Sequence, residues 1–121
     1  MKVVPLRLSP GDDLHLCLEA WMALQQAQAG CVISAVGSLS VAQLRLAGQP
    51  EGTTIKGDLE MLCLAGTLSP DGGHLGAGSL VRTTAELVIG LLPEWRFCRQ
   101  LDPATGYAEL EIHPSQPIKG S

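Results

Sequence analysis

The chain has 121 residues and a net charge of −4; hydrophobic residues make up 45% of it and charged residues 17%. This length suits one domain with a single core, and the eight Lys and Arg residues are too few for the basic surface that phosphate binding requires. Because a small domain must cover much surface with polar groups, the high apolar content predicts self-association.

The first predicted elements are a strand and a helix. Weak alternation favours a strand over Lys2–Leu8, in which Pro5 is typical of a sheet edge. Ser9, Pro10 and Asp12 then predict the start of a helix. Ser9 is the expected N-cap, Pro10 takes the first helical position, and Asp12 completes a capping box.

Apolar side chains at three-to-four spacing continue this helix to about Ala29, so one of its faces is expected to pack on a sheet. Gly30 follows as the residue that ends the helix. A buried strand is predicted over residues 31–36, and Gly37 with Ser38 interrupts it. Half-exposed alternation over residues 39–47 indicates the next strand.

The centre of the chain holds two apolar segments around a glycine-dense turn. A short strand over 54–56 leads into an apolar run at 61–68 that predicts a buried strand. A second strand is expected over 80–89, which is rich in β-branched residues. The glycines between them indicate either turn geometry or close approach of a backbone or ligand. The candidate ligand pocket there consists of Gly73, His74, Gly76 and Gly78.

Two further strands are predicted near the end of the chain, over 96–101 and 107–112, joined by a turn at 102–106. We expect one domain over residues 1–113 and a flexible tail over 114–121, which contains two prolines.

The cysteines are widely spaced and form no Cys-x-x-Cys pair, the spacing that is typical of zinc and redox motifs. They are Cys17, Cys31, Cys63 and Cys98. Reduced, buried thiols are the expected state, since free cysteine is among the most buried residue types. The opening residues are too few for a signal peptide, and the run at 61–68 is too short to cross a membrane. We therefore expect a cytoplasmic protein that does not associate with membranes.

Several segments together resemble the plants-and-prokaryotes-conserved (PPC) domain. In chain order they are LSPGDDL at 8–14, SAVGSL at 34–39, GDLEML at 57–62, LAGTLS at 64–69, GHL at 73–75 and TAEL at 84–87. Their order and spacing match over roughly residues 5 to 112. The resemblance implies an α+β fold, with a mainly antiparallel β-sheet and one principal α-helix, assembled as a homotrimer. The chain looks like the stand-alone prokaryotic form, because it lacks the AT-hook of the plant proteins.

The resemblance also implies a contact segment for a partner protein or a second subunit. The residues that correspond to it are Gly57, Asp58, Leu59, Glu60, Met61 and Leu62. In plants this motif reads Gly-Arg-Phe-Glu-Ile-Leu. Gly57, Glu60 and Leu62 agree with it, whereas Asp58 and Leu59 depart from it.

A metal ligand is implied at His74. Family members usually carry a His-x-His strand and a further turn before a Gly-Gly-His, and some prokaryotic relatives look able to hold a metal with these histidines. Here Gly73 and His74 follow Asp71 and Gly72 directly, so about a hairpin's length of chain is missing relative to the family pattern. Either the protein is natively short here, or a loop is left out of this sequence. Three copies of His74 could meet on a trimer axis and hold zinc or another divalent metal, which needs three or four ligands. A surface or interfacial histidine is the alternative.

The expected function is a trimeric binding or scaffolding module linked to transcription, rather than an enzyme. The chain has no Gly-x-Ser-x-Gly motif and no Ser, His and acid set at motif spacing. DNA binding is one alternative, disfavoured by the charge of −4 unless a basic partner takes part. The other is a metal-dependent enzyme with sites between subunits, for which three histidines are few.

Overall fold

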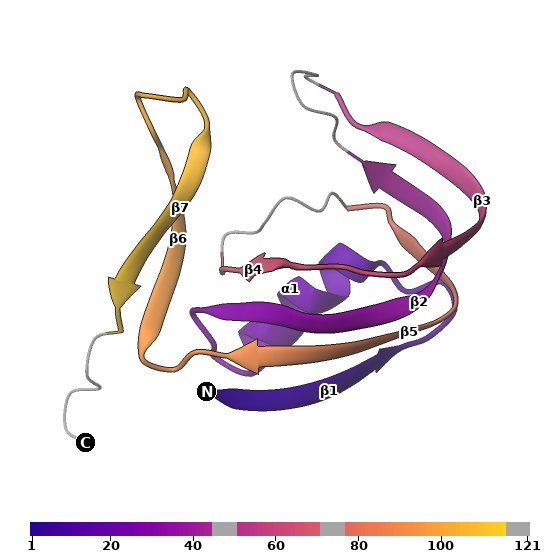
Figure 1. Ribbon diagram of the computed structural model, residues 1–121, viewed down its shortest axis with the longest axis horizontal. Coiled ribbons are helices and arrows are strands. Elements are labelled where there is room, and N and C mark those ends of the chain that lie inside the picture. The colour runs from indigo at the N-terminus through magenta and orange to yellow at the C-terminus, as the bar shows by residue number, and fades with distance from the viewer. Residues whose placement is uncertain (45–50, 71–76, 116–121) are drawn as a thin grey trace.

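The computed structural model describes residues 1–44, 51–70 and 77–115. In chain order its elements are β1 (Lys2–Leu8), α1 (Leu14–Leu24), β2 (Gly30–Leu44), β3 (Thr53–Met61), β4 (Gly66–Leu68), β5 (Leu80–Leu91), β6 (Trp95–Leu101) and β7 (Ala108–Pro114). The helix lies against one face of a curved antiparallel sheet, and β6 and β7 form a separate hairpin beside it (Figure 1). The fold is therefore α+β, mainly antiparallel with one helix in the described residues, as expected.

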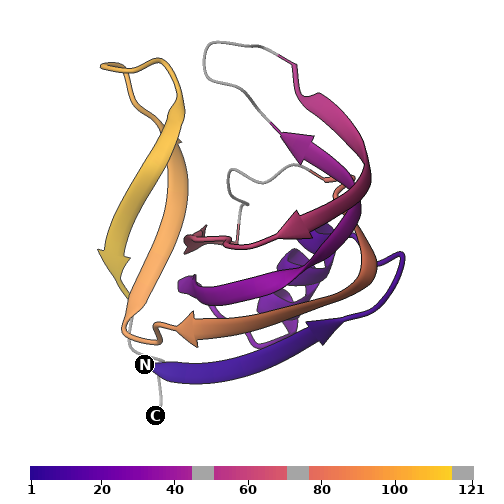
Figure 2. The same cartoon turned by 45° about the vertical axis from the view of Figure 1, so that its right-hand side comes forward.

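β2 is the central strand of the main sheet, whose order is β1-β5-β2-β3, with β4 also paired to β2. One edge of β2 pairs with β5 from Gly30 to Val41. The other edge is shared, since β4 pairs with its first three residues and β3 with the part from Gly37 onward. β2 has 15 residues and bends along its length, from the part that pairs with β4 to the part that pairs with β3 (Figure 2).

The break predicted at Gly37 and Ser38 is wrong, because β2 continues through both residues and only its register shifts there. A Cβ atom at Gly37 would lie 2.8 Å from Ala85 Cα and closer still to the Thr84 carbonyl oxygen of β5. Glycine therefore serves close approach of two backbones here, and does not end the strand. Of the second predicted strand, residues 45–47 lie outside the described part of the chain.

The helix begins four residues later than predicted, with Asp13 as its N-cap in place of Ser9. Gly11 has a φ of +85°, which a right-handed helix does not accept. The Ser9 amide donates to the Asp12 carboxylate (2.8 Å), so Ser9 and Asp12 close a turn instead. The Gly11 amide is drawn toward β5, where it donates to the Val81 carbonyl (2.8 Å).

The helix also ends earlier than the predicted Ala29. Its last residue is Leu24, and Gln26 turns the chain with a φ of +54°, a left-handed conformation more often taken by glycine. The Ala27 amide still donates to the Met22 carbonyl (3.1 Å). Gly30 is consequently the first residue of β2 and not the helix end.

The core lies between α1 and the sheet, which confirms the predicted apolar helix face. The helix contributes Leu14, Leu18 and Met22, and β5 contributes alternate residues. These are Val81, Ala85, Leu87, Ile89 and Leu91. Burial of alternate β5 side chains is the pattern of an antiparallel sheet with one covered face. Among the described residues, no helix is long and apolar enough to cross a membrane.

The strand predicted over 61–68 is wrong in extent, whereas the one over 80–89 is confirmed as β5. β3 absorbs the short strand expected at 54–56 and ends at Met61. Leu62 is then 80% exposed, and pairing resumes only at β4. The interruption occurs where the edge of β2 passes from one partner strand to the other, so an apolar run alone did not reveal it.

The predicted C-terminal hairpin is confirmed as β6 and β7, with Asp102 accepting from the Gly106 amide in the turn (2.7 Å). β7 extends beyond the expected Ile112 to Pro114, and the Ser115 amide donates to the Glu94 carbonyl (2.9 Å). The hairpin attaches to the main domain through the Phe97 amide, which donates to the Gln28 carbonyl (2.8 Å).

The close approach at Gly37 yields a stability prediction. Gly37→Ala should lower the free energy of unfolding by about 1–3 kcal/mol, because the new methyl group meets backbone atoms that cannot move independently. Gly66→Ala is the matched control, since Gly66 also lies in a strand but has no atom within 4 Å of its Cβ position. Urea unfolding at one fixed protein concentration measures both, and equal losses would contradict the steric explanation.

Candidate functional site

The predicted contact segment forms the end of β3, where the strand alternates between core and solvent. Gly57 has a φ of +145° and lies where the pairing with β2 shifts register. Leu59 and Met61 pack against the core. Asp58 and Glu60 point away from it and are exposed. The segment therefore offers two carboxylates to solvent, followed by the exposed Leu62.

Polar contacts to neighbouring strands fix this segment. The Arg82 guanidinium of β5 pairs with the Asp58 carboxylate (2.8 Å). Ser38, which faces Glu60 in register, bonds Thr83 of β5 through their hydroxyl groups (2.6 Å) and accepts from the Thr83 amide (3.2 Å). Both ion-pair partners are exposed, so the Asp58 contact orients the side chains more than it stabilises the fold.

The face of the sheet opposite the helix carries apolar side chains. We call it the open face and define it by Val3, Pro5, Cys31, Ile33, Val36 and Val88. Three of these are about half exposed, with values of 53% for Val3, 49% for Ile33 and 46% for Val36. An outward sheet face is normally polar. Three half-exposed aliphatic side chains on one sheet face, one from β1 and two from β2 on either side of β5, are a feature of surfaces that bind something.

Strand register places these residues together. Val3 of β1 pairs with Gly90 of β5, which pairs in turn with Cys31 of β2. A Cβ atom on Gly90 would lie 3.1 Å from Ile33 Cδ1 and 3.3 Å from Cys31 Sγ, so both side chains lie over Gly90. Val36 lies further along, opposite Glu86. The open face is therefore one continuous surface over three strands.

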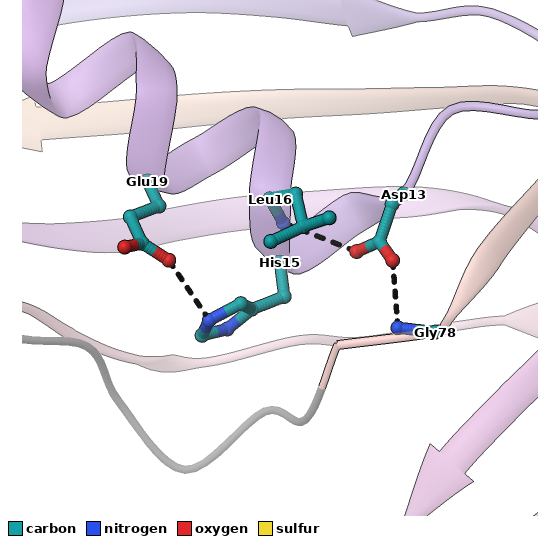
Figure 3. A network of polar contacts seen from close by, with 5 residues as sticks. All are labelled: Asp13, His15, Leu16, Glu19 and Gly78. Carbon is teal, nitrogen blue, oxygen red and sulfur yellow. Dashed lines mark hydrogen bonds and ion pairs between the residues drawn. The ribbon is translucent and has the colours of Figure 1, made fainter.

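Asp13 joins the start of the helix to the chain that enters β5. One of its carboxylate oxygens accepts from the Leu16 amide (3.1 Å) and the other accepts from the Gly78 amide (2.6 Å), as Figure 3 shows. The second contact spans 65 residues of sequence. His15 lies beside this contact and pairs with Glu19 (3.1 Å) on the same helix.

Gly78 belongs to the predicted ligand pocket. Its backbone conformation and close neighbours are those of a tightly packed turn before β5. Its φ is +100°, and a Cβ atom there would lie 3.1 Å from Gln43 Cγ. Gln43 in turn exchanges two hydrogen bonds with Thr54 (2.8 and 3.0 Å). Ser79 is 1% exposed and accepts the Gln43 amide (2.9 Å). These contacts fix the chain at the point where it returns to the sheet.

The other predicted pocket residues, Gly73, His74 and Gly76, lie outside the described residues. Of the remaining histidines, His113 belongs to β7, just beyond the predicted end of the last strand, and contacts Glu111 (3.2 Å). Cys98 of β6 lies directly opposite Glu111. The sequence signal for this grouping was the alternation of Glu109, Glu111 and His113, which continues the predicted last strand by one step.

The cysteines differ in their surroundings, and all four are free thiols. Burial raises the pKa of Cys17, and the neighbouring carboxylates of Asp12 and Asp13 raise it further. Since the thiolate is the reactive form, Cys17 is a poor nucleophile. Cys63 is exposed, contrary to the expectation that the thiols are buried, and the other three are partly buried.

The double contact of Asp13 yields a second prediction. Asp13→Ala should lower the free energy of unfolding by about 2–3 kcal/mol, because it removes a helix cap and leaves the Gly78 amide without its acceptor. Hydrogen exchange at the Gly78 amide should accelerate together with this loss. Asp12→Ala is the control, since its carboxylate accepts a single exposed amide, that of Ser9. Unchanged exchange at Gly78 would contradict the role given to Asp13.

The chain is similar to known proteins over nearly its whole length. It is 49% identical to the bifunctional protein GlmU of two Synechococcus strains, and it spans about one fifth (21%) of the length of those proteins. The first of these alignments covers 130 positions and 94% of this chain, so this chain has gaps at about 16 positions. A hypothetical protein from Salmonella cholerae-suis has the same fold, with a TM-score of 0.89 and 36% identity over 95% of both chains.

A plant- and prokaryote-conserved (PPC) protein from Pyrococcus horikoshii shares the fold at lower similarity, with a TM-score of 0.69, 18% identity and 92% of each chain covered. The model of the Plants and Prokaryotes Conserved (PCC) domain matches residues 1–72. That stretch runs from β1 beyond β4 and includes the helix and the β3 segment. The chain belongs to the Plants and Prokaryotes Conserved domain family, also written PPC.

Proposed function

We propose that this protein is a homotrimeric binding module whose copies pack through the open face. The observation that carries this proposal is the half exposure of Val3, Ile33 and Val36 on one sheet face (53%, 49% and 46%). Burying aliphatic surface between copies gains about 25 cal/mol for each Å² removed from water. The open face supplies such surface, and the three-copy assembly follows from the family resemblance.

The rim of the open face suits contact between copies. Arg7 of β1 and Glu86 of β5 are opposite one another in register and both are exposed. An apolar centre with charged residues at its margin is the usual composition of an interface. Opposite charges at the margin also allow copies to orient each other.

The end of β3 is the proposed contact segment for a protein partner. Asp58, Glu60 and Leu62 are exposed together, on a strand end that is held by β2 and β5. A rigid segment loses little conformational entropy when it binds. Its two carboxylates and Leu62 fit a basic, partly apolar surface on a protein partner. We propose that contact with such a partner links this protein to transcription.

The relatives support the idea of a module. The same unit accounts for 21% of a bifunctional protein and for 95% of a separate solved chain. We propose that the unit acts through binding and assembly in both settings. We propose that this chain works in the cytoplasm, where an exposed thiol such as Cys63 stays reduced.

The assembly makes a direct prediction for the mass in solution. Sedimentation at micromolar concentration should give about 38 kDa, three times the chain mass of 12.7 kDa. Val36→Glu should reduce this mass to that of one chain, because the new carboxylate would be buried without a partner.

Leu24→Glu is the matched control, since Leu24 is 81% exposed but lies at the end of the helix, on the other side of the sheet. It should leave the mass unchanged. Circular dichroism checks that both variants are folded. A wild-type protein that sediments as a folded single chain would overturn the proposal, as would a Val36→Glu protein that keeps the trimer mass.

DNA binding is the competing function, and salt dependence separates it from the proposal. The charge of −4 on each chain opposes phosphate contacts, and Arg82 already pairs with Asp58. Titration with duplex DNA should therefore show weak binding at low salt and a shallow loss as salt rises. Tight binding with a steep salt dependence, the sign of many released counterions, would favour the DNA-binding function instead.

A further inference from the structure

The β6–β7 hairpin brings three metal-ligating side chains of different type together. They are Cys98 of β6 with Glu111 and His113 of β7, and one ligand atom from each lies within 4.8 Å of the others. The Glu111 carboxylate is 3.2 Å from His113 Nε2 and 3.8 Å from Cys98 Sγ. The same Glu111 oxygen makes both contacts, so it lies between the thiol and the imidazole.

These separations are close to those of a metal site. Zinc binds thiolate at about 2.3 Å and imidazole or carboxylate at about 2.0–2.2 Å in a tetrahedron, which sets neighbouring ligand atoms about 3.4–3.6 Å apart. The two contacts of Glu111, 3.2 Å to His113 and 3.8 Å to Cys98, bracket that range. The third separation, between Cys98 Sγ and the nearer His113 ring nitrogen, is at most 4.8 Å, so the three ligand atoms already surround one small volume.

The backbone fixes the three residues before any ion binds. Cys98 and Glu111 are directly paired across the hairpin, and His113 follows two residues after Glu111 on the same face. The hairpin is held to the domain by the hydrogen bond from the Phe97 amide to the Gln28 carbonyl (2.8 Å). Because the ligands lie on paired strands, binding costs little ordering of the chain.

The surroundings favour a borderline-soft ion with an open position. Cys98 and His113 are partly buried, which strengthens their interaction with a cation relative to full exposure. Cys98 also lines an open hollow of about 280 Å³ together with Gln28, Pro70, Arg96 and Phe97. Three protein ligands leave one tetrahedral position, and Arg96, which also lines the hollow, adds positive charge that favours an anion there.

We propose that Cys98, Glu111 and His113 bind one zinc ion per chain, with the fourth position open to water or a small anion from the hollow beside Arg96. Thiolate and imidazole favour zinc over magnesium or calcium, which prefer oxygen ligands. The site is separate from His74, so it does not depend on the metal implied there by the family resemblance.

The test measures metal binding to the full-length protein by equilibrium dialysis with zinc and by absorption with cobalt. One equivalent of zinc per chain is expected. Cobalt should give intense visible bands together with a thiolate-to-metal charge-transfer band. Cys98→Ser should abolish the charge-transfer band. Glu111→Gln and His113→Gln should each weaken zinc binding by about 100-fold or more, since even outer-shell partners contribute 10–100-fold.

Two controls make the assignment specific. Cys63→Ser removes an exposed thiol outside the cluster and should change nothing, and His74→Ala tests the histidine that the family resemblance implies as a ligand. Wild-type protein that binds no zinc would overturn the proposal. So would zinc binding that survives all three cluster substitutions, or that is lost in His74→Ala while Cys98→Ser keeps it. Glu111→Gln preserves side-chain size, and its circular dichroism shows whether lost binding reflects a lost ligand or a lost fold.

Discussion

Hydrogen bonding along both edges of β2 is the constraint on which the other elements depend. β5 takes one edge of β2, and β3 and β4 divide the other. The strand can hold β5 this closely because Gly37 has no side chain where the backbone of Ala85 passes. β1 then extends the sheet from the far side of β5, and the helix that follows β1 covers one face.

Covering a single face has a physical consequence for the other. Alternation places every second β5 side chain toward the helix, so the remainder must face outward. In this chain several outward positions on β1 and β2 are aliphatic, with Val3, Ile33 and Val36 about half exposed. The apolar content that is unusual for a small domain is thus concentrated on one surface. The proposed association through that surface and the proposed zinc site on the β6–β7 hairpin use different parts of the molecule.

Sequence patterns predicted elements whose determinants are local, and missed those set by distant residues. β1, β5 and the C-terminal hairpin follow from alternation and turn residues, and the family resemblance anticipated the fold class. The helix start was misplaced because Asp13 is fixed partly by Gly78, 65 residues away. The end of β3 was hidden in an apolar run, since the change of partner along β2 leaves no local mark. The grouping of Cys98 with Glu111 likewise depends on hairpin register.

The contact between Asp13 and Gly78 has a consequence for how sequence changes affect this domain. β4 fastens the chain to β2 on one side of residues 69–77, and the Asp13 carboxylate fastens it to the helix on the other. Because these two attachments are independent, weakening one of them leaves the other in place. The exit from β4 and the entry into β5 are thus fixed by separate contacts, and a sequence change at one need not disturb the other.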